Sequence, residues 1–159
     1  MERTLFFVKP CFDEYDECIA LPAKARRFTP EDREETISFL EEKLGKDTFR
    51  TLTCKRVKAS KEFWEQFYIH VKTKFPKSYE AMCTDFADKE IIVYVLEGEN
   101  IIERVRKIVG PTKYELNIGK GTLRERFSSS LNVYRTAAHA SNIEGVKKDL
   151  ELFEQYGLF

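Results

Sequence analysis

The chain contains only two histidines, and they stand in different settings. His70 falls among aromatic residues on an expected helix, which is an ordinary place for a partly exposed histidine. His139 ends a short apolar stretch and comes just before Ala140-Ser141-Asn142, where another helix is expected to begin. A side chain at such a junction can meet both solvent and the amide donors that favour anions. His139 is therefore the candidate nucleophile.

Several cations occupy positions that would suit a phosphate-binding site. Lys9 ends the first expected strand and Arg135 lies in the last, so the two are neighbours if these strands pair. Arg106 lies inside an otherwise apolar helix, and Arg124 follows the Gly121-Thr122 turn. Polyphosphate binding needs several ammonium or guanidinium donors that converge without a carboxylate among them. Each cation alone is typical of a solvated surface charge, and the sequence permits such a cluster without proving it.

Other chemistries lack their motifs. The segment 119–122 resembles a phosphate-binding loop only superficially, because Tyr114 stands where its upstream glycine belongs and Gly121 replaces the hydroxyl residue. Two histidines and scattered cysteines give no zinc-binding spacing, and no serine nucleophile motif appears. These observations argue against a zinc enzyme and a serine hydrolase.

The composition indicates one globular domain over residues 1–159, because 42% of the residues are hydrophobic and 34% are charged. Lysine plus arginine equals aspartate plus glutamate, 27 each, so no global charge directs the protein to nucleic acid or to a membrane. The longest apolar runs, such as Ile91–Leu96, are too short to span a bilayer. No signal peptide is recognised, and four cysteines without paired spacing read as reduced thiols. A cytoplasmic protein is expected.

The elements expected around these residues alternate between strands and helices. They are a strand at Arg3–Val8, a loop or insertion at 11–28, a helix that Thr29-Pro30 begins, a strand at Phe49–Val57, a helix capped by Ser60, a strand at Glu90–Leu96, a helix at Glu99–Val109, a glycine-containing loop to about Thr122, a short strand near Val133–Ala138 and a last helix capped by Asn142. This order contains the βαββαβ alternation of an α+β, ferredoxin-like fold. We expect an antiparallel sheet with helices on its faces and added helices.

Four segments in order resemble nucleoside diphosphate kinases. They are Glu2–Pro10, Leu96–Arg106 with Val109–Thr112, Gly121–Arg124 and His139–Ser141. The resemblance implies a ping-pong reaction in which a nucleoside triphosphate phosphorylates the histidine and a nucleoside diphosphate then takes the phosphoryl group. It also implies Mg²⁺ bridged between the phosphates of the nucleotide, and a homo-oligomer, either a hexamer or a tetramer of dimers.

The same resemblance assigns roles to individual residues. His139 is the nucleophile, with Tyr68 placed to hydrogen-bond near it, Ser141 to support it and Asp149 to orient it from the last helix. The expected nucleotide contacts are Lys9, Arg106, Thr112 and Arg124 at the phosphates, Phe75 or its neighbourhood with Val133 around the base, and Thr136 near the sugar. Arg135 matches a family arginine with a more structural role.

Departures from the family pattern keep other interpretations open. Thr136 stands where the family has an asparagine that contacts the sugar hydroxyl, Cys11 replaces an aspartate, and Asn142 replaces another. With the insertion at 11–28, these departures allow a catalytically weak relative that binds nucleotides or partners as a regulatory module. A nucleic-acid-binding ferredoxin-like domain is disfavoured by the neutral net charge.

Overall fold

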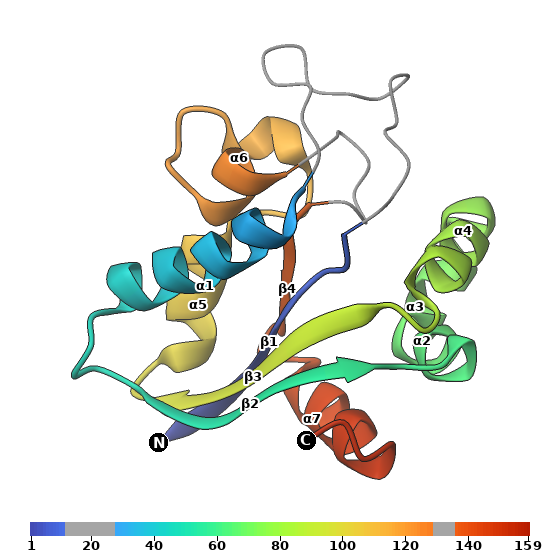
Figure 1. Ribbon diagram of the computed structural model, residues 1–159, viewed down its shortest axis with the longest axis horizontal. Coiled ribbons are helices and arrows are strands. Elements are labelled where there is room, and N and C mark those ends of the chain that lie inside the picture. Colours follow the sequence, from blue (N-terminus) through green and yellow to red (C-terminus); the bar gives the residue numbers. More distant parts are fainter. Residues whose placement is uncertain (12–27, 129–135) are drawn as a thin grey trace.

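The computed structural model describes residues 1–11, 28–128 and 136–159 and builds them around one antiparallel sheet. Its strands are β1 (Glu2–Val8), β2 (Arg50–Lys58), β3 (Glu90–Gly98) and β4 (Ala138–Ala140), in the spatial order β2-β3-β1-β4. The helices are α1 (Pro30–Leu44), α2 (Lys61–Phe67), α3 (Ile69–Lys72), α4 (Pro76–Phe86), α5 (Ile101–Val109), the 3-10 turn η2 (Tyr114–Asn117), α6 (Leu123–Phe127) and α7 (Val146–Gln155). The expected α+β, ferredoxin-like class is confirmed (Figure 1).

The sheet separates two apolar cores. Alternate residues of β1 enter opposite cores, so Leu5 and Phe7 pack with α2, α4 and α7, whereas Phe6 and Val8 pack with α1, α5 and α6. Because helices cover both faces, the last five residues of β1 are all buried. Figure 1 shows the two groups of helices on either side of the strands. The central strands are thereby fixed from both faces.

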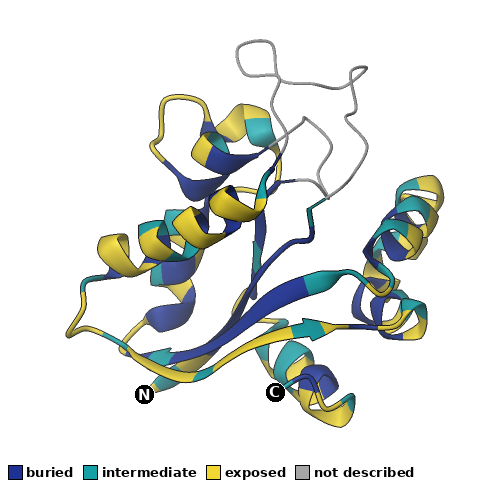
Figure 2. Ribbon diagram, in the orientation of Figure 1, coloured by how far each residue is buried: buried dark blue, intermediate teal, exposed yellow. Residues whose placement is uncertain are grey.

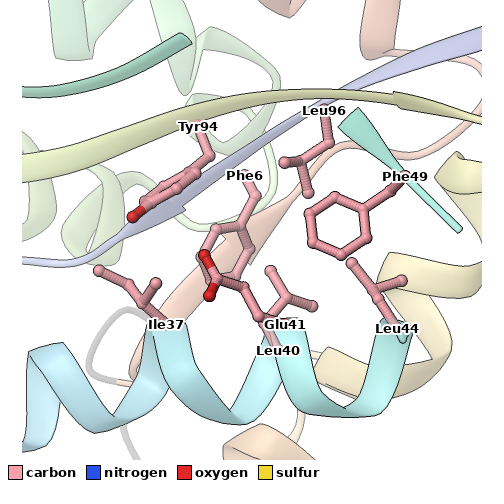
Figure 3. A pocket seen from close by; sticks show the side chains of 8 residues that line it. All are labelled: Phe6, Ile37, Leu40, Glu41, Leu44, Phe49, Tyr94 and Leu96. Carbon is pink, nitrogen blue, oxygen red and sulfur yellow. The ribbon is translucent and has the colours of Figure 1, made fainter. Parts of the chain in front are cut away.

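Helix α1 forms where the sequence predicts it. Thr29 caps the helix in a capping box with Asp32, and Pro30 occupies the first turn. Leu40 and Leu44 are buried toward the sheet, and Ile37 is half-buried beside them. Figure 3 shows this stripe facing side chains of the sheet across a small apolar hollow; the remaining lining residues are Phe6, Glu41, Phe49, Tyr94 and Leu96. The hollow is thus part of the second core.

The outer strand β2 is much more exposed than its neighbours. Most of its residues are exposed, while β3 is buried over six consecutive positions, Ile91–Leu96 (Figure 2). Charged side chains on β2 pair with other elements: Arg50 contacts Glu97, and Arg56 contacts Glu34 and Glu90. Such charged side chains are a usual feature of edge strands.

Several local expectations were wrong. The helix after Ser60 ends at Phe67, and α3 and α4 follow it, with α4 unforeseen. Asn142 does not cap the last helix, because α7 begins at Val146 after Gly145; the Asn142 side chain instead accepts a bond from the Gly145 amide at 2.6 Å. Most of the insertion expected at 11–28, and the part of the last strand expected at 133–135, lie outside the described residues.

Candidate active site

The candidate nucleophile lies within a strand rather than at its end. His139 is the central residue of β4 and is paired with Phe7 of β1 in the antiparallel register. Directly paired residues carry their side chains on the same face of a sheet, so this register places the two rings together. The rings stack with centroids 5.0 Å apart and 20° between planes, and Phe67 of α2 meets the imidazole edge-on at 5.1 Å. The His139 side chain keeps 23% of its surface exposed.

One carboxylate oxygen organises the polar side of this histidine. Asp149 lies in the first turn of α7, and its Oδ2 stands 3.3 Å from Nε2 of His139. The same oxygen accepts a bond from the Ser141 hydroxyl at 2.5 Å. Because a carboxylate only accepts, Nε2 must carry the proton, which leaves a lone pair on Nδ1. Within the described residues, Nδ1 has no hydrogen-bond partner.

Burial keeps this ring neutral. It lowers the pKa of His139 from the ordinary value of 6.5, and the nearby positive charges of Lys9 and Arg124 act in the same direction. The hydrogen bond and negative charge of Asp149 oppose this shift without cancelling it. Near neutral pH the imidazole is therefore neutral, with its one proton on Nε2 and a nucleophilic lone pair on Nδ1.

Three cations surround the strand that carries His139. Lys9 is 5% exposed and donates from Nζ to the Thr136 hydroxyl at 3.2 Å. Arg124 of α6 is 6% exposed and donates to the carbonyls of Gly110 and Ala138, at 2.7 and 2.9 Å. Arg106 of α5 is exposed and donates to the carbonyl of Ala140 at 3.0 Å. The cations that the sequence singled out are thus brought together with the histidine.

Burial and neighbouring positive charge disfavour the charged forms of Lys9 and Arg124. Burial, and then the charge of Arg124, holds the pKa of Lys9 well below its usual value. Burial, and then the charge of Arg106, lowers the pKa of Arg124 to about 10. The Nε of Arg124 is buried without a hydrogen-bond partner. Because burial and like charge disfavour these positive charges, a bound anion would be stabilised here.

A loop held by several hydrogen bonds connects α5 to α6. It contains Gly110, whose carbonyl accepts from Arg124, and the expected phosphate contact Thr112. Gly110 has φ +93°, and a Cβ there would stand 2.0 Å from the Asn117 side-chain oxygen, so only glycine fits. Asn117 donates to the carbonyls of Pro111 and Lys113 and accepts from the Thr122 hydroxyl at 2.7 Å. These bonds fix the turn between the end of α5 and Arg124.

The remaining expected site residues are placed less directly. Tyr68 is buried, and burial followed by the charge of Asp149 raises the pKa of its phenol, while Arg124 opposes this. Thr136 is fully buried. Thr112 is exposed, and Phe75 is 61% exposed at the start of α4; neither side chain has a hydrogen bond or ring contact within the described part of the chain. Val133 and Arg135 lie outside the described residues.

Sequence reasoning missed the two rings that touch the nucleophile. The alternation of β1 marks Phe7 as buried, and the stripe of α2 marks Phe67 as core. Only the pairing of β1 with β4 shows that both rings contact His139.

In residues 1–11, 28–128 and 136–159, no group of three or more His, Cys, Asp or Glu side chains is arranged to hold a metal ion. None of the helices in those ranges is long and apolar enough to cross a membrane.

Solved structures share the architecture. A nucleoside diphosphate kinase of Aquifex aeolicus superposes with a TM-score of 0.68 at 23% identity, covering 96% of this chain and 94% of that one. A nucleoside diphosphate kinase of Encephalitozoon cuniculi gives 0.70 at 19% identity, covering 96% and 88%. The fold is therefore the one that nucleoside diphosphate kinases adopt.

Sequence comparison identifies the family. The family model described as nucleoside diphosphate kinase matches residues 32–155. A nucleoside diphosphate kinase of Persephonella marina is 35% identical over 106 residues, which is 66% of this chain and 72% of that protein. One of Rhodospirillum centenum is 32% identical over 106 residues, which is 65% and 71%. The chain belongs to the nucleoside diphosphate kinase family, and it is an enzyme of the kinase type.

Proposed function

We propose that this protein transfers the γ-phosphoryl group of a nucleoside triphosphate to a nucleoside diphosphate by a ping-pong mechanism, through a phosphohistidine at His139. One observation carries the proposal: a neutral imidazole whose Nε2–H faces the Asp149 carboxylate lies beside the buried cations Lys9 and Arg124, whose pKa values burial lowers. Nucleophile and phosphate-binding charge are thus combined in one place.

The chemistry follows from the proton on Nε2. Nδ1 attacks the γ-phosphorus, a P–N bond forms, and the bond from phosphorus to the bridging oxygen breaks. The nucleoside diphosphate leaves with that electron pair. The proton stays on Nε2, where the Asp149 carboxylate stabilises the positive charge that the ring acquires. The second half-reaction reverses these steps with a different diphosphate, so one site serves donor and acceptor.

The cations supply the electrostatic part of the reaction. Phosphoryl transfer is mainly positioning and stabilisation of charge on the phosphate oxygens. Lys9 and Arg124 are buried beside the histidine, and Arg106 is held against β4 by the Ala140 carbonyl. We propose that these three side chains, with Thr112, bind the phosphates. We propose that Mg²⁺ enters as part of the nucleotide substrate.

The base and sugar contacts remain predictions. Phe75 is exposed enough to stack on a base, and Val133 lies outside the described residues. Thr136 has no exposed surface and accepts a bond from Lys9, so it would contact a sugar only if its hydroxyl became accessible. The hexamer or tetramer, and the cytoplasmic location, are likewise predictions; light scattering of the purified protein measures the first.

Labelling with [γ-³²P]ATP tests the proposal. The wild type is expected to form an acid-labile, alkali-stable phosphoenzyme that loses its label when GDP is added. His139→Gln is expected to remain unlabelled, and the matched control His70→Gln, at the other histidine, is expected to label normally. Stoichiometric labelling of His139→Gln would refute the assignment.

The burial of Thr136 favours one alternative, a relative that binds nucleotides but transfers phosphate slowly. Turnover with ATP and several diphosphates separates the two functions. Tight nucleotide binding without transfer would support the regulatory function, and faster transfer by Thr136→Asn would locate the defect at this position.

A further inference from the structure

The packing around His139 has a second consequence, which rests on the proposed function. Phe7 and Phe67 are 0% and 4% exposed, and together they cover the face and one edge of the imidazole. We name these two rings the aromatic slot. They come from β1 and α2, so the slot is formed by tertiary packing and not by β4 itself.

The hydrogen bond to Asp149 is a weak orienting force. Its 3.3 Å length exceeds the usual N–H···O distance of about 2.9–3.0 Å. The accepting oxygen is shared with Ser141, whose bond is much shorter at 2.5 Å. The terminal torsion of a histidine is broad, so the side chain itself selects no ring orientation. Something besides this bond must hold the ring.

The walls of the slot are rigidly packed. Phe7 contacts Trp64, Phe67 and Phe153, with ring centroids 5.5, 5.7 and 5.9 Å apart. Phe153 lies on α7, one turn after Asp149, so the same helix supports both the slot and the carboxylate. A flat ring held between fixed walls rotates only if the walls move, which close packing resists.

We propose that Phe7 and Phe67 are positioning residues that hold the His139 imidazole in one orientation and so restrict phosphorylation to Nδ1. A half-turn of the ring would exchange Nδ1 with a carbon atom and would separate Nε2 from Asp149. A rotated ring therefore presents either no nucleophile or the wrong nitrogen to the phosphate. The slot does not contact the nucleotide. It increases the fraction of molecules in which the His139 ring presents Nδ1 to the phosphate.

Leucine substitutions test this role. Phe7→Leu is expected to lower kcat about tenfold, because orientation is lost. The KM for ATP is expected to stay unchanged, and part of the phosphohistidine is expected to be the Nε2 isomer. Phe67→Leu is expected to act in the same direction and provides a second variant if Phe7→Leu does not fold. The ³¹P NMR spectrum of the alkali-denatured phosphoenzyme distinguishes the two isomers.

Phe6→Leu is the matched control. Phe6 is the neighbouring residue on β1, is also 0% exposed, and faces the opposite core, where it contacts Tyr94. It is expected to lower the melting temperature in the way Phe7→Leu does, while leaving the isomer and kcat unchanged. An isomer shift in Phe6→Leu, or none in a folded slot variant, would overturn the slot proposal alone.

The wild type supplies the remaining outcomes. Phosphate on Nε2 of wild-type His139 would overturn the slot proposal while leaving the phosphohistidine intact. A wild type that forms no phosphohistidine would overturn the proposed function, and with it the chemical role of the slot. The two failures are therefore distinguishable in one experiment.

Discussion

Asp149→Asn isolates the charge on the group that orients the nucleophile. A single oxygen, Oδ2, meets both Nε2 of His139 and the Ser141 hydroxyl. The amide oxygen of asparagine can occupy that position and accept both bonds, so the ring keeps its proton on Nε2. The substitution changes charge while it leaves shape and hydrogen-bond count nearly the same.

The expected loss follows from the strength of the two kinds of bond. Hydrogen bonds to charged groups contribute about 1.5–3 kcal/mol, and neutral ones about 0.5–1.5 kcal/mol. The ring becomes positive during transfer, so a difference of roughly 1–1.5 kcal/mol acts in the transition state and lowers kcat about 5–10-fold. Asp149→Ala also leaves two donors without an acceptor, which raises the loss to as much as about 100-fold.

Rapid-quench measurement of phosphoenzyme formation at pH 8 is the assay. Asp149 raises the pKa of His139, so its neutralisation lowers that pKa further, and the ring stays neutral in both proteins. Protonation therefore cannot account for a slower rate. The KM for ATP is expected to stay constant, because the Asp149 side chain makes its hydrogen bonds, within the described residues, with His139 and Ser141. A wild-type rate in Asp149→Asn, or a raised KM at constant kcat, would refute the proposal that the negative charge of Asp149 stabilises the transition state.

Three further predictions concern acid, a glycine and a threonine. Because the pKa of folded His139 lies below 6.5, the neutral nucleophile should persist at pH 6.5, and a pH–rate profile should place the acidic limb of kcat/KM, which reports the free enzyme, below that value. The unfolded chain takes up this proton first, so the free energy of unfolding should fall as pH drops below 6.5, and less so in His139→Gln. Gly110→Ala should lower the free energy of unfolding by more than about 1 kcal/mol and raise the KM for ATP, since its Cβ collides with Asn117; an unchanged KM in a folded protein would contradict the loop's role. Thr136→Val should cost about 1–3 kcal/mol of stability in urea titrations, because buried Lys9 loses an acceptor, and Thr136→Ser should restore it.

The sequence predicted the elements whose signals are local. The capping residues Thr29 and Pro30 marked the start of α1, and the buried runs of β1 and β3 marked strands that are covered on both faces. Helix α4 carried a readable signal that was overlooked, with Pro76 in its first turn and a buried stripe at Tyr79, Met82, Cys83 and Phe86. Helix α6 spans five residues, too few for a periodic pattern.

The surroundings of the histidine depend on distant residues. Family motifs brought Lys9, Arg124 and His139 together before the structure did, because each stands in a recognisable segment. The aromatic slot has no such segment. It follows from the register of β1 against β4, and a shift by one residue would carry the Phe7 ring to the other face of the sheet. Long-range pairing of this kind is not encoded in local spacing.

Strand β4 contacts the helices on both sides of the sheet, through its carbonyl groups on one side and the His139 ring on the other. In an antiparallel pair, the backbone groups of alternate residues point away from the partner strand. Since β4 is an edge strand, its outward-pointing carbonyls at Ala138 and Ala140 accept hydrogen bonds from Arg124 and Arg106 instead. These arginines come from α5 and α6 on one side, while the histidine ring packs against α2 and α7 on the other. Partial melting of either helical layer would therefore abolish turnover before the molecule unfolds globally. On gradual warming, phosphotransfer activity should therefore be lost at a lower temperature than helical circular dichroism, so an activity assay would detect local unfolding before a spectroscopic one does.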